Sequence, residues 1–166
     1  MVGFSLPGYQ IQPGSPLDRP SLVRLMERNR QELTGDVSGP SMGTTVDRYL
    51  SYQTPLWWVW PEAPAQGPDA VACLWLGQAI DPHNGQPHPY LLLLYVSPDH
   101  RRRGIATALL QVAHGWARGR GYSQISLQVW THNQPAQALY RKFGYQPEAI
   151  LMKSYLGDGD SLGQNP

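Results

Sequence analysis

The chain has 166 residues, 41% of them hydrophobic, and a formal net charge of +1. This length suffices for one domain with a sizeable core, and we expect that domain over residues 1–156, followed by a flexible polar tail over 157–166. The near-neutral charge provides no field that would draw the protein onto nucleic acid or anionic lipid, so neither is expected as a partner. Any anion site must therefore be local.

The sequence also bears on compartment. The first ten residues, MVGFSLPGYQ, lack a basic start followed by an apolar stretch, and no run of about 18 apolar residues occurs. We therefore predict a soluble, cytoplasmic protein with no membrane partner. The single Cys73 excludes a disulfide within the chain, and its apolar neighbours Ala72 and Leu74 favour a packed core thiol over a nucleophile.

Short elements separated by turn-forming residues are predicted in the N-terminal half, from apolar periodicity and capping residues. In chain order, they are a strand at 8–12, a helix that Asp18 or Ser21 caps and that ends near Leu33, a loop at 34–43, a short helix with Val46, Tyr49 and Leu50, and a hairpin of strands at 55–63 and 71–80. The second strand of this hairpin runs antiparallel to the first. Trp57, Trp58 and Trp60 project to both faces of their strand, and we expect at least one to pack in the core.

Strands and helices alternate in the C-terminal half, which favours parallel neighbours with right-handed crossovers. The expected elements are a strand at 90–96, a helix from Ile105 to the glycines at 119 and 121, a strand at 125–130, a helix from Gln134 to Phe143, and a strand at 148–155. The strand YLLLLYV at 90–96 is apolar at consecutive positions, so both of its faces should be covered. The fold class predicted is a single mixed α/β domain with about four helices.

The stretch DHRRRGIATALL, residues 99–110, places three arginines and Gly104 between a buried strand and a helix. At such a turn, free backbone N–H groups and the positive end of the helix dipole point outward and bind anions. Gly104 permits a backbone geometry that a side chain would obstruct, and the arginines add forked donors suited to phosphate. The pattern alone also fits a solvated surface turn. It differs from the dinucleotide fingerprint and from the P-loop, since it has one glycine and no following lysine.

A second stretch, NQPAQALYRKFGY at 133–145, begins with a capping residue and continues with an apolar helical face. Asn133 and Tyr140 are seven residues apart, which is two helical turns, so both can line one groove. Taken alone, this pattern also fits a helix cap and a core tyrosine.

Together, the two stretches resemble the GNAT superfamily of acetyl-CoA-dependent N-acetyltransferases, over about residues 71–156. The first is similar to the family's pyrophosphate motif, R/Q-x-x-G-x-G/A, with Arg101, Gly104 and Ala106. The second is similar to N-x-x-A-x-x-L-Y-x-x-x-G-F/Y. Its matching residues are Asn133, Ala136, Leu139, Tyr140, Gly144 and Tyr145. The resemblance implies a GNAT-like fold whose parallel strands splay at the cofactor site, and it implies no metal.

The resemblance also implies site residues for acetyl-CoA. Backbone amides of the anion turn would hold the pyrophosphate, with Arg101, Arg103 or Lys142 reaching an outer phosphate. The amides in question belong to Arg101, Arg102, Arg103, Gly104, Ile105, Ala106 and Thr107. The main chain at Leu94 and Val96 would bind the pantetheine arm and the thioester oxygen, and Asn133 and Ala136 would contact the same arm. Tyr140 would protonate the leaving thiolate or donate a hydrogen bond to it.

A general base is harder to place. Members similar to ribosomal-protein Nα-acetyltransferases often carry a glutamate where this chain has Gln128, and an amide cannot accept a proton. A base would come from Glu62, His83, His88 or a water chain, or would be unnecessary, and we expect both histidines in surface loops. The missing carboxylate favours an acceptor of low pKa, since an α-amine titrates at about 7.7 to 8.0 and a lysine at about 10.4.

The resemblance thus implies an acyltransferase that moves an acetyl group from acetyl-CoA to a primary amine of a small molecule or a protein. The resemblance implies an acceptor pocket built by the first two helices and their loop at residues 34–43, the WWVW strand and Tyr155. Two other hypotheses remain: a non-catalytic acyl-CoA sensor, and an interaction surface built from exposed tryptophans. The acceptor and the oligomeric state, a homodimer included, stay open.

Overall fold

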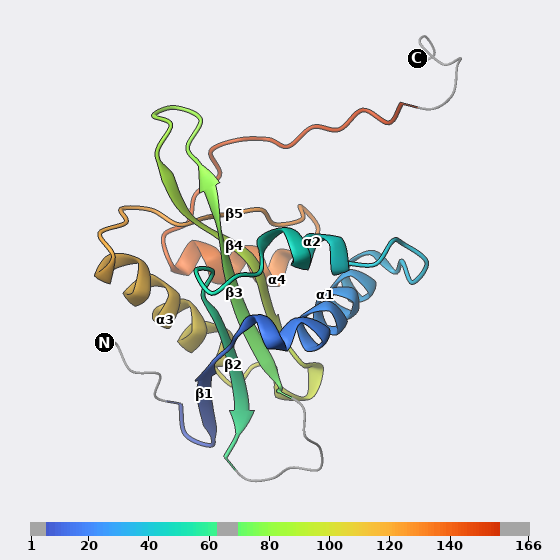
Figure 1. Cartoon of the computed structure of the whole chain (residues 1–166), viewed down its shortest axis with the longest axis vertical. Helices are drawn as coiled ribbons and strands as arrows, with labels where there is room; N and C mark the ends of the chain where they lie inside the picture. Colours follow the sequence, from blue (N-terminus) through green and yellow to red (C-terminus); the bar gives the residue numbers. More distant parts are fainter. Residues whose placement is uncertain (1–5, 63–69, 157–166) are drawn as a thin grey trace.

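The computed structural model describes residues 6–62 and 70–156, and the tail predicted at 157–166 lies outside them. A five-stranded sheet runs through the centre in the order β1-β2-β3-β4-β5 (Figure 1). The strands are β1 (Tyr9–Pro13), β2 (Leu56–Pro61), β3 (Ala72–Ile80), β4 (Pro87–Val96) and β5 (Ser126–Leu127). The first four are antiparallel neighbours, and β5 pairs with β4 in parallel.

The helices cover both faces of this sheet. They are α1 (Arg19–Thr34), α2 (Gly43–Tyr49), α3 (Ile105–Gly119) and α4 (Gln134–Lys142), with short 3-10 turns η1 (Pro16–Asp18) and η2 (Pro98–His100). In Figure 1, α1 and α2 lie on one side of the sheet, and α3 and α4 lie on the other. The mixed α/β fold with four helices is confirmed. None of the described helices is long and apolar enough to cross a membrane.

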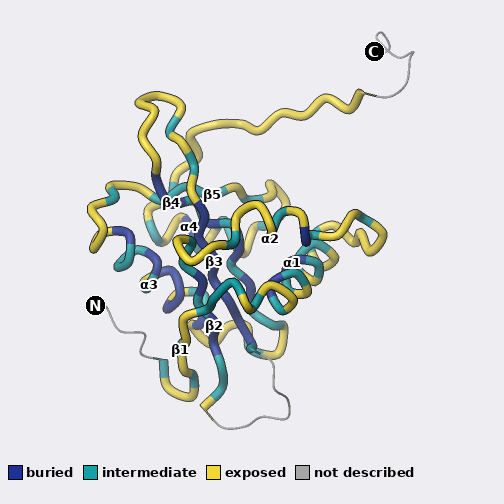
Figure 2. The backbone as a smooth tube through the Cα atoms, in the orientation of Figure 1, coloured by how far each residue is buried: buried dark blue, intermediate teal, exposed yellow. Residues whose placement is uncertain are grey.

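Two apolar clusters hold these layers together, one on each face. Leu109 and Leu110 of α3 pack with Leu74 of β3 on one side, whereas Leu22 of α1 packs with Trp75 of β3 on the other. All are fully buried, and Figure 2 shows the buried residues gathered along the central strands. Leu91 of β4 packs in the first cluster and Leu93 in the second, so the prediction that β4 is covered on both faces is confirmed. Cys73 is a buried core thiol, as expected, and burial raises its pKa.

The three tryptophans of β2 also lie as predicted. Trp57 packs against the α3 and α4 cluster, whereas Trp58 and Trp60 pack against the α1 and α2 cluster. Trp58 is buried, and its indole N–H donates to Asp18 over 3.1 Å. Asp18 precedes α1 without capping it through its side chain, because that carboxylate also accepts from the backbone N–H of Ser15.

A β-bulge lies in the middle of β4. Trp75 pairs with Leu93, and the next residue of β3 pairs with Leu91, so Leu92 has no partner. Leu92 and Leu93 both pack on the α1 and α2 side, which reverses the alternation of faces. Beyond the bulge, Leu94 therefore packs on the α3 and α4 side.

Two strand predictions of the C-terminal half are corrected. The strand expected at 125–130 is reduced to Ser126–Leu127, because the chain leaves β4 after that point. The strand expected at 148–155 does not form. Residues 146–156 are exposed and run away from the sheet (Figures 1 and 2), since the two-residue β5 offers almost no edge to pair with.

Candidate active site

Because β5 pairs with β4 only at Tyr90 and Leu91, the edge of β4 beyond Leu91 is left unpaired by the residues that the structure describes. The backbone N–H of Ser97 donates to Val71 over 2.8 Å, toward the β3 side. Alternate residues of a strand point their N–H groups in opposite directions, so those of Leu94 and Val96 point away from β3. The two strands pair only at Tyr90 and Leu91, and the N–H groups of Leu94 and Val96 therefore face an unpaired gap. We call this space, between β4 and the chain beyond β5, the gap.

The anion turn, residues 101–107, lies at the C-terminal end of β4. Arg102 and Gly104 have φ values of 63° and 83°, in the left-handed region that most residues avoid. The first internal acceptor of α3 is the carbonyl of Gly104, which receives the N–H of Ala108 over 3.0 Å. The N–H groups of residues 102–107 donate to no acceptor within the described part of the chain. The turn thus presents consecutive free donors at the positive end of a helix dipole.

The arginines of this turn do not act alike. The Arg101 guanidinium donates to the carbonyl of Val96 over 2.9 Å and to the carboxylate of Glu32, and its backbone N–H donates to Pro98. Arg103 approaches the hydroxyl of Tyr9 at 3.4 Å, and Arg102 is exposed. Because Arg101 already has partners, the candidate phosphate ligands of this turn are the side chains of Arg102 and Arg103 and the backbone amides of residues 102–107.

Apolar residues of α4 pack in the cluster on the α3 and α4 face of the sheet. Tyr140 is 9% exposed, and its ring centroid lies 5.6 Å from that of Tyr145 in an edge arrangement. Burial raises the pKa of Tyr140 to about 12. Tyr140 and Ala136 of α4, Leu94 and Val96 of β4 and Ile105 of α3 all belong to the cluster on the α3 and α4 face. The fold therefore brings both sequence motifs together beside the gap.

Asn133 caps α4, as the sequence suggested. Its Oδ1 accepts the backbone N–H of Ala136 over 3.3 Å. Its amide nitrogen has no such role in the helix, and is free to donate to a ligand.

We expect Asn133→Ala to lower the free energy of unfolding by about 1 kcal/mol, because the cap is lost. Asn133→Asp keeps an oxygen for the cap and removes the NH₂ donor. If that donor holds the pantetheine arm, Asn133→Asp will keep the stability measured by urea unfolding and still bind acetyl-CoA more weakly. Equal acetyl-CoA affinity of Asn133→Asp and the parent would limit the residue to capping.

Of the candidate bases, one has an unexpected location. Glu62 and His83 are exposed, at opposite ends of the sheet. His88 lies within β4 and is 7% exposed, with Nε2 2.7 Å from the hydroxyl of Ser126 and with no partner at Nδ1. The expectation that His88 lies in a surface loop is wrong, because β4 begins at Pro87 rather than at residue 90. Gln128 is exposed just beyond β5.

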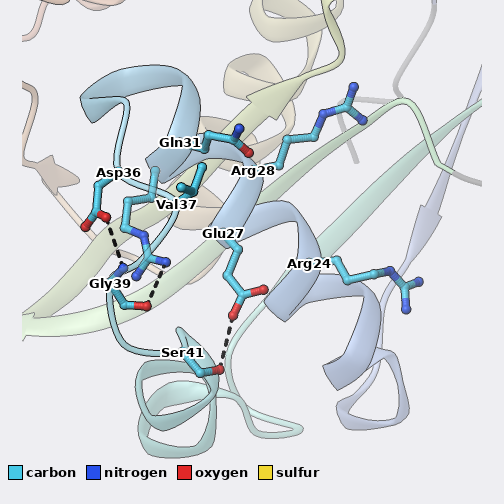
Figure 3. Close-up of a pocket in the computed structure, with 9 residues that line it drawn as sticks. Arg24, Glu27, Arg28, Gln31, Asp36, Val37, Gly39 and Ser41 are labelled. Carbon is cyan, nitrogen blue, oxygen red and sulfur yellow. Dashed lines mark hydrogen bonds between the residues drawn. The ribbon is translucent and has the colours of Figure 1, made fainter.

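A pocket of about 440 Å³ lies between α1 and the loop that follows it (Figure 3). Glu27 accepts from the hydroxyl of Ser41, and Arg30 donates to the carbonyls of Gly39 and Pro40, so the loop is tied to the helix. This pocket includes part of the loop at 34–43 from which we expected an acceptor pocket, but neither the WWVW strand nor Tyr155 lines it. Its lining is mostly charged: Arg24, Glu27, Arg28, Arg30, Gln31, Asp36, Val37, Gly39 and Ser41.

A network around Glu32 was not anticipated from the sequence. Glu32 accepts from the Tyr95 hydroxyl over 2.7 Å and from Arg101, and Arg28 lies 3.7 Å away. Burial opposes ionisation, but the hydrogen bonds from Arg101 and Tyr95 outweigh it and lower the pKa of Glu32. Burial and the bond to Glu32 raise the pKa of Tyr95 to about 12, so this phenol stays a donor. No local pattern signals these contacts, since Glu32 and Arg101 are 69 residues apart.

Comparison with known proteins defines the class. The family model described as "Acetyltransferase (GNAT) family" matches residues 23–145, and the chain belongs to this family. This match includes both motifs and most of the sheet. The resemblance stated from the sequence is therefore confirmed.

Individual relatives are more distant. The human N-acetyltransferase 8 is 32% identical over 105 residues, which are 63% of this chain and 44% of that protein, so the chain spans less than half of its length. Among solved structures, a GCN5-related N-acetyltransferase from Ralstonia eutropha has a TM-score of 0.69 at 23% identity, covering 90% of this chain and 100% of the other. An aminoglycoside acetyltransferase from an uncultured soil sample has a TM-score of 0.66 at 24% identity, covering 90% and 99%. These structures share the fold.

Proposed function

We propose that this protein is an enzyme that transfers an acetyl group from acetyl-CoA directly to a primary amine. The observation that carries the proposal is the convergence, beside the gap, of the free amides of the anion turn, the open edge of β4 and the buried Tyr140. Membership of the GNAT family supports it. No covalent enzyme intermediate is involved.

The residues present fit acetyl-CoA. The amides of residues 102–107, at the start of α3, would hold the pyrophosphate. Arg102, Arg103 and Lys142 belong to the two motifs and are exposed, and they would serve an outer phosphate. The N–H groups of Leu94 and Val96 would hold the pantetheine arm and the thioester oxygen. When bound, acetyl-CoA supplies an activated acetyl thioester.

In this proposal, the proton donor and the acceptor amine lie on opposite faces of the sheet. Tyr140 approaches from the α3 and α4 face and would donate a hydrogen bond to the departing sulfur. The acceptor amine would enter from the α1 and α2 face, which carries the pocket of Figure 3. Leu127 packs on the α3 and α4 face, so Ser126 and its partner His88 lie toward the acceptor side. Of the three candidate bases, His88 is thus the one buried within the sheet on this face, whereas Glu62 and His83 are exposed.

The acceptor should be an amine of low pKa, because Gln128 stands where a carboxylate base would be and its amide cannot accept a proton. We expect a peptide with a free α-amine to be acetylated at least about tenfold faster at pH 7 than an Nα-blocked lysine, since far more of the α-amine is neutral. Raising the pH to 9 should narrow the ratio. Thiol release measured with both acceptors tests this, and faster turnover of the lysine at pH 7 would contradict it.

The first test of the proposed function is calorimetric titration with acetyl-CoA, followed by thiol release with a panel of amines. Binding with steady turnover of any amine supports the enzyme. Binding without turnover across small amines, peptides and lysines favours the acyl-CoA sensor, for which the missing carboxylate at Gln128 is the motivating observation. No binding would remove the basis of both.

A further inference from the structure

The last turn of α1 contacts both sides of the gap. On the β4 side, Glu32 accepts from Tyr95 over 2.7 Å and from Arg101. On the side of the chain beyond β5, Nε2 of His132 lies 3.1 Å from the backbone carbonyl of Leu33, the residue after Glu32. His132 directly precedes Asn133, which caps α4. A carbonyl oxygen only accepts, so His132 carries its proton on Nε2. The last turn of α1 thus contacts both β4 and the chain beyond β5, which do not pair with each other at this point.

The contact with Leu33 uses a backbone group that is unpaired within the helix. The last four carbonyls of a helix have no internal partner. The carbonyl of Gln31 receives the N–H of Gly35 over 2.8 Å, and the carbonyl of Leu33 receives His132. The end of α1 is therefore fixed through its own backbone as well as through Glu32.

The Arg101 side chain makes three contacts in this arrangement. Its Nε donates to the carbonyl of Val96, which faces the gap, and its terminal nitrogen donates to Glu32. The guanidinium carbon also lies 5.9 Å from the centre of the Tyr95 ring. Arg101 directly precedes Arg102, whose left-handed conformation begins the run of free amides. Fixing the Arg101 side chain thus fixes the start of the anion turn.

We propose that Glu32 is a positioning residue that couples acetyl-CoA binding at the anion turn to the end of α1 and the pocket beside it. The inference rests on the proposed function. Arg28 and Gln31, on the turns next to Glu32, line the pocket of Figure 3, and the loop from residue 35 starts where the bridge ends. Acetyl-CoA on the turn stabilises the Arg101 geometry, Arg101 holds Glu32, and Glu32 holds the wall of the acceptor pocket. Such coupling is reciprocal, so an occupied pocket strengthens acetyl-CoA binding in turn.

The first arm of the test measures the Kd for acetyl-CoA by calorimetry in a double-mutant cycle. Glu32→Ala and Arg101→Ala should each weaken binding about fivefold, the low end for coupled sites because the pair is partly exposed. The double variant should be no weaker than the single ones, because Glu32 acts through Arg101. Glu32→Gln, which keeps an oxygen for Tyr95 and loses the charge, should fall between the parent and Glu32→Ala.

The second arm measures hydrogen exchange with and without acetyl-CoA. In the parent, bound acetyl-CoA should increase the protection of residues 30–42 as well as that of the anion turn. In Glu32→Ala, the turn should still be protected and residues 30–42 should not. A merely structural role of Glu32 would loosen residues 30–42 equally in both states. Circular dichroism establishes that each variant is folded, and Glu32→Gln and Tyr95→Phe give milder changes should Glu32→Ala unfold.

Asp47→Ala is the matched control. It also removes a carboxylate that binds an arginine through two bonds, to Arg19, but it lies between α1 and α2 and touches neither β4 nor the turn. Its Kd and its ligand-dependent protection should equal those of the parent. Parent-like values in Glu32→Ala, or a double variant about 25-fold weaker than the parent, would overturn the coupling. Failure of the parent itself to bind acetyl-CoA would overturn the proposed function and the inference with it.

Discussion

Replacing Gly104 with valine should weaken acetyl-CoA binding more than about 100-fold. Gly104 has a φ of 83°, which a β-branched residue adopts only under strain, and so the turn will rearrange. The cause is conformational, because a Cβ at this position would meet only Leu6, at an ordinary 3.5 Å. Rearrangement redirects the neighbouring amides, and losing two hydrogen bonds to a charged phosphate costs about 1.5–3 kcal/mol each. Calorimetric titration measures the effect.

Gly85→Val provides the control for this variant. Gly85 has a φ of 70° in the hairpin turn between β3 and β4, and a Cβ there would meet nothing within 4 Å. The substitution therefore imposes similar backbone strain far from the anion turn. We expect a comparable loss of stability with an unchanged Kd. Retained acetyl-CoA affinity in Gly104→Val, with the fold intact, would contradict the assignment of the anion turn.

The anion turn and the central strand were predictable because their signals are local. A glycine between a buried strand and an amphipathic helix specifies a left-handed residue at the helix start, and Gly104 has that conformation. The apolar run of β4 required cover on both faces, and both clusters provide it. Neither conclusion depends on residues distant in the sequence.

The side-chain partners and the strand ends were not predictable, because they depend on the tertiary arrangement. Arg101 has a side chain suited to binding phosphate, yet it donates to the carboxylate of Glu32, 69 residues away. His88 follows a run of turn-forming residues and nevertheless lies in a strand, where Ser126 of β5 becomes its partner. The apolar pattern at 148–155 indicates a strand, but a strand forms only where an edge is available to pair with.

The strand β5 is shorter than its sequence predicts, and the difference lies at the candidate site. The residues at 125–130 alternate as a strand should, and the local pattern favours six residues of pairing. Two residues pair, and the chain then separates from β4. The shortfall leaves the amides of Leu94 and Val96 free for a ligand, so the departure from the local expectation lies at the candidate site.

Tyr140→Phe should lower kcat about 100-fold, the low end of the range for a general acid, and leave the Kd for acetyl-CoA nearly unchanged. Burial raises the pKa of Tyr140 to about 12, so its hydroxyl stays protonated and available as a donor throughout the neutral range. The leaving thiolate, whose conjugate thiol has a pKa of about 8.5, cannot take this proton fully without a cost of about 5 kcal/mol. The hydroxyl is therefore expected to stabilise the thiolate chiefly by donating a hydrogen bond. Its contribution should persist without loss up to at least about pH 10.

Tyr145→Phe separates this role from packing. Tyr145 lies against Tyr140, and its hydroxyl is 3.0 Å from Nε2 of His114, so the control also removes a hydroxyl from the same cluster. We expect it to change stability and to leave kcat within about threefold of the parent, since its hydroxyl is already paired with His114. Single-turnover measurements, with chemistry shown to limit the rate, give the decisive comparison. Full turnover of Tyr140→Phe across the pH range under those conditions would exclude the donor role, and the free amides at the edge of β4 would then have to supply the catalysis.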